Sequence, residues 1–161
     1  MNRYAAQVYL IPEDDADRQL ADGFVLHDQV NASRIQIMPP AGGWSYVLRT
    51  FQDEYVSRLR ANPKGHVVML IDFDGDYGSR RAAFERAIPD DLKQRVFVLG
   101  PKQTPEILRK ELGRSFEQIG LALADDCHAG TAVVWSHEEL KHNEPDRQRL
   151  FQVVKPILFV A

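Results

Sequence analysis

The chain has 161 residues, of which 44% are hydrophobic and 27% charged, and its formal net charge is -3 at pH 7. This length predicts one domain with a sizeable core, and the slightly acidic balance excludes a protein that binds nucleic acid through its overall charge. Cys127 is the only cysteine and no apolar stretch approaches about 18 residues, so the sequence excludes an internal disulfide and predicts a cytoplasmic protein with no membrane association.

Hydrophobic patterning predicts strands and helices that alternate along the chain. Strands are expected at 5–12, 33–40, 66–73 and 95–100, with a short further strand at 131–135. Helices are expected at 14–30, 44–62, 79–88, 104–112, 115–127 and 146–158. This alternation predicts a three-layer α/β fold, in which a largely parallel central sheet carries helices on both faces.

Acidic side chains gather directly after two of the predicted strands. The first group comprises Glu13, Asp14, Asp15 and Asp17, and the second comprises Asp72, Asp74 and Asp76. Ligands of parallel sheets bind at the carboxyl ends of the strands, so both groups are expected at one edge of the sheet. A divalent cation would relieve the repulsion between the acids, and carboxylate oxygens suit Mg²⁺ or Mn²⁺.

Within these groups we expect Glu13, Asp72 and Asp74 to bind one ion, with Asp76 as a further ligand. Asp17 comes four residues after Glu13, on the same face of a helical turn, where it suits a second ion. Two neighbouring ions are a common arrangement for cleaving phosphodiesters. A plainer interpretation stays open, because acids also complement the dipole at a helix start and an Asp-Gly pair also forms solvated turns.

The order of these motifs resembles that of a TOPRIM domain. The motifs are Glu13 and Asp17 in "PEDDAD", the glycine pair of "MPPAGG", and Asp72 and Asp74 in "IDFDGD". The likeness is greatest to the TOPRIM nucleases of the OLD (overcoming lysogenization defect) family and to small related proteins of bacterial defence loci. It covers residues 5–110 of a single domain spanning 1–161, in which 111–161 form a helical C-terminal extension.

The resemblance implies roles for individual residues. Glu13 would bind metal and act as general acid or base, and Asp72 and Asp74 would complete the metal site. Glu106, after the fourth strand, would be another ligand, and Lys141 would offset charge on the phosphate. Glu106 also suits the first turn of a helix, and Lys141 also suits a solvated helix surface, so these two alternatives stay open.

The chain departs from the family pattern at two positions. Asp14 stands directly after the first glutamate, where the family usually has glycine, and Asp17 is shorter than the usual glutamate. Both departures bear on whether the site holds one ion or two.

The family resemblance implies that DNA is the substrate and that the protein acts in anti-phage defence. Arg80, Arg81 and Lys102 are the candidate contacts to phosphates, and a charge-balanced surface is the alternative explanation for them. The chain has no Gly-rich phosphate-binding loop, so an ATPase partner would be a separately encoded subunit.

Two other functions fit parts of the sequence. The first is a non-catalytic TOPRIM-fold subunit of an ATPase complex. The second is a phosphatase similar to haloacid dehalogenases, with Asp72 as nucleophile, Asp74 as acid or base, and Asp125 and Asp126 as Mg²⁺ ligands. The apolar segment 152–161 leaves a further choice open between the last part of the core and a surface for a partner or a homo-oligomer.

Overall fold

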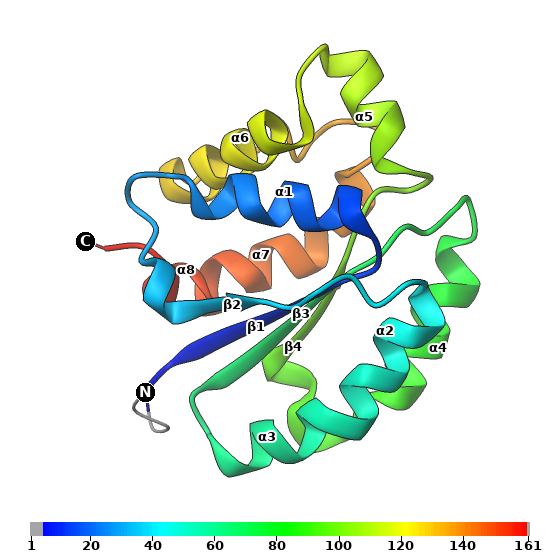
Figure 1. Ribbon diagram of the computed structural model, residues 1–161, viewed down its shortest axis with the longest axis vertical. Coiled ribbons are helices and arrows are strands. Elements are labelled where there is room, and N and C mark those ends of the chain that lie inside the picture. The colour runs from blue at the N-terminus through cyan, green and yellow to red at the C-terminus, as the bar shows by residue number, and fades with distance from the viewer. Residues whose placement is uncertain (1–4, 161) are drawn as a thin grey trace.

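A four-stranded, all-parallel sheet forms the middle layer of the computed structural model, which describes residues 5–160 (Figure 1). Its strands are β1 (Gln7–Pro12), β2 (Ile35–Ile37), β3 (Gly65–Leu70) and β4 (Val96–Leu99). They lie in the spatial order β2-β1-β3-β4. The predicted three-layer α/β fold is therefore confirmed.

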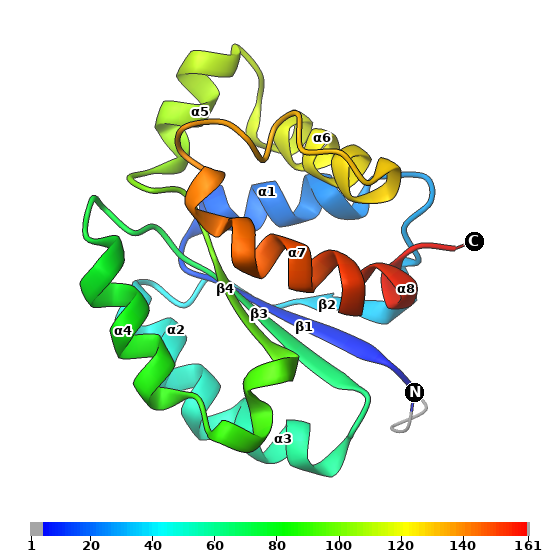
Figure 2. The same cartoon turned by 180° about the vertical axis from the view of Figure 1, so that it is seen from behind.

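Helices cover both faces of the sheet (Figures 1 and 2). One face carries α1 (Asp15–Val25), α5 (Pro105–Leu112), α6 (Phe116–Ala129), α7 (Glu144–Val153) and α8 (Lys155–Leu158). The other face carries α2 (Trp44–Thr50), α3 (Val56–Ala61) and α4 (Tyr77–Ala87). A π-helical segment, Phe51–Tyr55, joins α2 to α3, and short 3₁₀ turns lie at Ala32–Arg34, Asp90–Arg95 and Lys141–Asn143.

The strand order creates a switch point between β1 and β3. The chain first moves from β1 outward to β2, and then crosses back over β1 to form β3 on its other side. Because crossovers between parallel strands are right-handed, this reversal places the two connections on opposite faces of the sheet. The carboxyl ends of β1 and β3 flank this switch point, which is the place where open parallel sheets bind their ligands.

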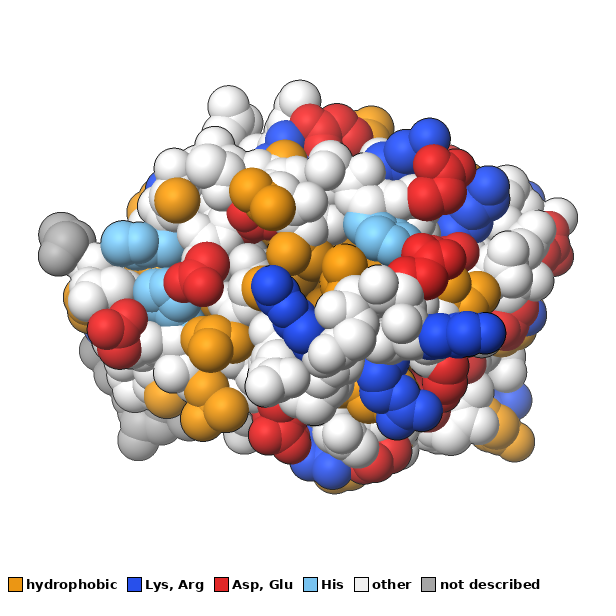
Figure 3. All heavy atoms as spheres, turned by 90° about the horizontal axis from the view of Figure 1, so that it is seen from above, with side chains coloured by type: hydrophobic (Ala, Val, Ile, Leu, Met, Phe, Trp, Pro, Cys, Tyr) orange, Lys and Arg blue, Asp and Glu red, His pale blue; other side chains and the backbone are white. Residues whose placement is uncertain are grey.

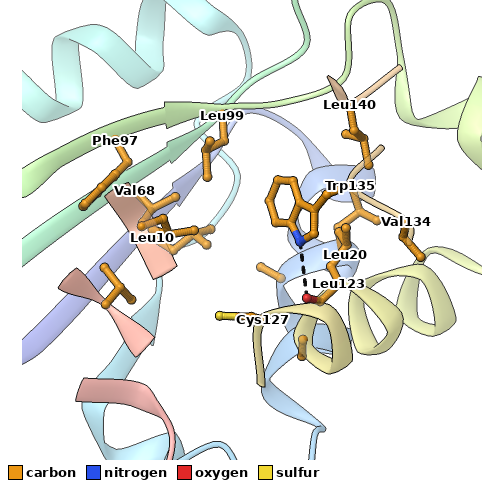
Figure 4. Packing of buried hydrophobic residues seen from close by; sticks show 14 of the residues in the cluster. Leu10, Leu20, Val68, Phe97, Leu99, Leu123, Cys127, Val134, Trp135 and Leu140 are labelled. Atoms are coloured by element: carbon orange, nitrogen blue, oxygen red, sulfur yellow. Dashed lines mark hydrogen bonds between the residues drawn. The ribbon is translucent and has the colours of Figure 1, made fainter. Parts of the chain in front are cut away.

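Each face of the sheet buries its own hydrophobic core. Along β1, Val8 and Leu10 enter the core under α1 and α6, while Tyr9 and Ile11 enter the core over α2, α3 and α4. Burial on both faces explains why the strands are continuous apolar runs. In the first core, the Trp135 indole nitrogen donates to the Leu123 carbonyl at 3.4 Å (Figure 4). That core lines a partly open, apolar pocket of about 90 Å³.

The C-terminal segment joins this first core. Leu150, Val154, Leu158 and Phe159 are buried there, so the structure favours core packing for the apolar C-terminal residues. The helix predicted for 146–158 is divided at Val154 into α7 and α8, just before Pro156. Proline cannot donate the hydrogen bond that a continuous helix needs at that position.

The short strand predicted at 131–135 is wrong, because this segment forms turns. The buried carboxylate of Asp126 accepts hydrogen bonds from the backbone N–H groups of Val133 and Val134, at 3.0 and 2.8 Å. It also accepts from the Thr131 hydroxyl at 2.7 Å. One side chain thus supplies the acceptors that a neighbouring strand would otherwise provide. The second strand is also shorter than predicted, covering only Ile35–Ile37 of 33–40.

Candidate metal centre

Glu13 and Asp72 meet at the switch point. Glu13 directly follows β1, and its backbone N–H donates to the Leu70 carbonyl at the end of β3, at 2.9 Å. The Glu13 Oε1 atom then accepts a hydrogen bond from the backbone N–H of Asp72 at 3.0 Å. Pairing between the two strands therefore brings together acids that lie far apart in the sequence, as the positions of the two acidic groups predicted.

Asp14 joins these two residues. One carboxylate oxygen from each of Glu13, Asp14 and Asp72 lies within 4.8 Å of the other two. Asp14 is the N-cap of α1, where its Oδ1 atom accepts from the backbone N–H of Asp17 at 3.0 Å. Asp14 is not among the metal ligands predicted from the sequence. The sequence signal for a ligand role was the position of Asp14 between a strand end and a helix start. An N-cap side chain at such a position is held close to the strand end.

Asp17 lies behind this cluster, in the first turn of α1. Its side chain is completely buried, at 0% exposure, and neither carboxylate oxygen has a hydrogen-bond partner among the described residues. The Oδ1 atom of Asp72 is likewise buried without a partner there. A buried carboxylate with no partner is costly, so a proton or a cation would stabilise each of these two carboxyl groups.

Burial changes the acidity of the whole cluster. It raises the pKa of Asp17 above the usual range of an aspartate, and the nearby carboxylates of Asp72 and Asp14 raise it further. Burial also raises the pKa of Asp72 and of Glu13. Several carboxyl groups therefore share one poorly solvated site, in which their charged forms repel each other.

A hard divalent cation fits this set of residues. All the available donor atoms are carboxylate oxygens, the ligands that Mg²⁺ and Mn²⁺ prefer. Glu13, Asp14 and Asp72 are close enough together to share one ion. The buried, unpartnered oxygens of Asp17 and Asp72 are an independent observation that fits a cation at this site. The predicted second ion at Asp17 stays a prediction.

Asp74 lies on the rim of the cluster and faces an arginine. Its backbone φ is 48°, and its Oδ2 atom accepts from Arg80 Nη1 at 2.6 Å. The same Arg80 nitrogen donates to the Asp72 carbonyl at 2.6 Å. Of the three cations predicted to contact phosphates, Arg80 is therefore the one whose side chain binds these acidic residues. The predicted role of Asp74 as a ligand stays a prediction, as does that of the exposed Asp76, at the N-cap of α4.

The remaining candidates lie outside the cluster of Glu13, Asp14 and Asp72. Glu106 is exposed in the first turn of α5, as its alternative interpretation predicts. Lys141 is exposed and pairs with Glu138 at 2.6 Å. Lys102 is exposed on the loop after β4, where its carbonyl accepts from the Gly75 backbone. That contact joins its loop to the acidic loop after β3.

Arg81 binds the outer edge of the sheet. Its Nη1 atom donates to the Val98 carbonyl of β4 at 3.2 Å and to the buried carboxylate of Asp146. Arg149 donates to the Val96 carbonyl at 3.1 Å and to the same Asp146 at 3.0 Å. These carbonyls belong to the free edge of β4, which the two guanidinium groups block against pairing with another strand. Arg81 therefore has a structural partner, and its predicted role in binding nucleic acid is untested.

The acids required by the phosphatase alternative lie elsewhere. Asp126 caps the turns at 131–135, and Asp125 pairs with His27 Nε2 at 2.9 Å. His27 follows the C-terminal end of α1, whereas the metal cluster lies at the N-terminal end of this helix. Figure 1 shows these two ends of α1 on opposite sides of the molecule. The geometry separates Asp125 and Asp126 from Asp72.

One face of the molecular surface carries mixed charge. On the face formed by α5 and α6, acidic and basic side chains are interspersed, with no broad field of one sign (Figure 3).

Within residues 5–160, no helix is long and apolar enough to cross a bilayer. No family model, curated protein or solved structure matches the chain.

Proposed function

We propose that the protein is a metal-dependent nuclease of TOPRIM type that hydrolyses phosphodiester bonds in DNA. One observation carries this proposal: the buried, unpartnered carboxylates converge at the switch point of a parallel sheet. Acids collected at such a place cost stability, and a bound cation would offset that cost. The order of the motifs along the sequence supports the nuclease class.

Each residue at the switch point has a role in this proposal. Glu13, Asp14 and Asp72 would hold Mg²⁺ or Mn²⁺, and the bound ion would stabilise charge on the phosphate and lower the pKa of water. Burial raises the pKa of Glu13, and this direction suits a group that takes part in proton transfer. Arg80 lies beside the acids and suits a non-bridging phosphate oxygen.

The resemblance supplies the biological part of the proposal. It supports a role in anti-phage defence, with a separately encoded ATPase as partner, and the lone cysteine supports a cytoplasmic setting. The formal net charge of -3 suits a nuclease that holds DNA through a local group of cations rather than through its overall charge.

DNA cleavage by three variants tests the function. Plasmid and linear DNA are incubated with wild type, Glu13→Gln, Asp72→Asn and the control Asp90→Asn, each in Mg²⁺, in Mn²⁺ and in EDTA. Asp90 is exposed and precedes β4, so it lies near the amino ends of the strands, whereas the acids follow their carboxyl ends. We expect cleavage only with metal, and more than about a hundredfold less of it in both site variants, because even supporting groups around a metal contribute 10- to 100-fold.

The other outcomes separate the alternatives. Cleavage that persists in both site variants would come from a contaminant and would contradict the assignment. If wild type binds Mn²⁺ but cuts no DNA, the partner-subunit function replaces the nuclease. Hydrolysis of p-nitrophenyl phosphate by wild type and by Glu13→Gln, with loss in Asp72→Asn, would instead support the phosphatase.

A further inference from the structure

One aromatic side chain stands exposed on the surface. Of the aromatic residues within 5–160, Tyr46 alone is exposed, at 51%. It lies in α2, and the guanidinium carbon of Arg49 sits over its ring, 5.4 Å from the centroid. Burying an exposed ring gains free energy, so a ring left open to solvent beside a cation is a candidate contact for a ligand.

Backbone contacts connect Tyr46 to the metal centre. The loop before α2 is bonded to the end of β1: the N–H of Gly42 donates to the Glu13 carbonyl at 2.9 Å. The next residue, Gly43, lies against the Tyr46 ring, where an added Cβ would stand 3.4 Å from the ring. The segment formed by Gly42 and Gly43 therefore contacts Glu13 through one glycine and the exposed ring of Tyr46 through the other.

A second pair of an aromatic ring and an arginine connects the start of α2 to the acids. The guanidinium carbon of Arg80 lies 5.2 Å from the centroid of the Trp44 ring. The same guanidinium donates to the Asp72 carbonyl and to the Asp74 carboxylate. Trp44 packs against the core, with its ring centroid 6.2 Å from that of Phe84, and the Arg80 guanidinium lies between this ring and the acids. Tyr46, two residues later in α2, faces solvent instead. An exposed aromatic ring close to arginines is typical of surfaces that bind unpaired nucleic acid.

We propose that Tyr46, Arg49 and Arg80 form a platform that holds an unpaired nucleotide next to the metal centre, with Trp44 supporting Arg80 from the core side. The base would stack on the Tyr46 ring and the arginines would contact the adjoining phosphates. A base inside a duplex has both faces covered by its neighbours, so only an unpaired base can stack in this way. The proposal rests on the nuclease function and narrows its substrate to DNA with a single-stranded segment.

Binding without metal tests the platform separately from cleavage. Fluorescence anisotropy in EDTA compares a labelled single strand, its blunt duplex, and the same duplex with a single-stranded tail. The proteins are wild type, Tyr46→Ala, Tyr46→Phe and the control Val133→Ala, whose side chain is 77% exposed on the other face of the sheet. Without metal, the acidic cluster repels the phosphates of every DNA tested. The ratio of single-strand affinity to duplex affinity is therefore the readout, because this common repulsion largely cancels in it.

We expect wild type to prefer the single strand and the tailed duplex. Tyr46→Ala should lose about tenfold in single-strand affinity, the typical contribution of one stacked base, with little change for duplex. Tyr46→Phe and Val133→Ala should behave as wild type, because both keep the stacking ring. Equal affinity for single strand and duplex, an unchanged Tyr46→Ala, or no binding at all would overturn the platform.

Cleavage on the same DNAs separates the two proposals. Preferential binding of single strands without any metal-dependent cleavage would support the platform and contradict the nuclease. Metal-dependent cleavage that is equal on all three DNAs, and equal in Tyr46→Ala, would support the nuclease and contradict the platform.

Discussion

At the scale of single residues, Asp17 is the most unusual group in the protein. A completely buried carboxyl group without a hydrogen-bond partner adds nothing to stability by itself, and it lies beside Asp72 and Asp14. Its raised pKa means that the folded protein holds a proton that the unfolded chain releases near neutral pH. Stability from such a group is complete below the pKa of the unfolded chain and is lost as the pH rises towards the folded pKa.

This reasoning predicts a pH dependence in the metal-free protein. In EDTA, the free energy of unfolding of wild type should fall as the pH rises from about 5 to about 8, by up to about 1.4 kcal/mol per pH unit for each group concerned. Asp17→Asn removes the titrating proton and should reduce this slope. Urea unfolding of both proteins across the pH range measures the difference, and identical slopes would contradict the assignment of the proton to Asp17.

At the scale of secondary-structure elements, α1 and α6 approach each other through glycine. A Cβ atom added to Gly120 of α6 would lie 2.0 Å from the Leu20 carbonyl oxygen of α1. A Cβ atom added to Gly23 of α1 would lie 2.0 Å from the Glu117 carbonyl oxygen of α6. In the sequence Gly23 only weakens the predicted helix. The structure shows that both glycines allow the two backbones to touch.

Replacing one of these glycines should separate the helices. Gly120→Ala should lower the free energy of unfolding by about 2–3 kcal/mol, because backbone atoms cannot move aside as a flexible side chain can. The matched control is Gly78→Ala in α4, where nothing lies within 4 Å of the new methyl group. This control should be neutral or more stable by up to about 1 kcal/mol. Denaturant unfolding measures both, and equal effects would mean that α1 and α6 do not approach so closely.

At the scale of the whole molecule, the acidic cluster proposed as the metal centre joins the middle two strands. Glu13 follows β1 and Asp72 follows β3, so an ion bound by both would connect the centre of the sheet to the start of α1. Any ligand that binds only the folded state stabilises the entire fold. The benefit should be large here, because the ion would also relieve the repulsion within a buried acidic cluster.

Thermal unfolding should therefore depend on the metal. At a Mn²⁺ concentration of about 100 times Kd, binding contributes about 2.7 kcal/mol, which raises the Tm of a protein of this size by roughly 5–10 °C. The shift should vanish in the double variant Glu13→Gln, Asp72→Asn and persist in Asp90→Asn. A shift of equal size in the double variant would place metal binding elsewhere on the protein.

Much of the fold and part of the site were predictable from local sequence patterns. Apolar runs of strand length, separated by helical periodicity, predicted the parallel sheet, since strands covered on both faces must be apolar throughout. The same strand ends placed Glu13 and Asp72 at one edge.

The sequence by itself determined which elements form and at which strand ends the acids stand, because both depend on residues close together in the chain. Only the tertiary structure decided which carboxylates meet. It brought Asp14 into the cluster, buried Asp17 without a partner, and paired Asp74 with Arg80. It also replaced the strand predicted at 131–135 by turns capped by a buried carboxylate. The physical reason is that burial and side-chain partners depend on how distant elements pack, which local patterns do not specify.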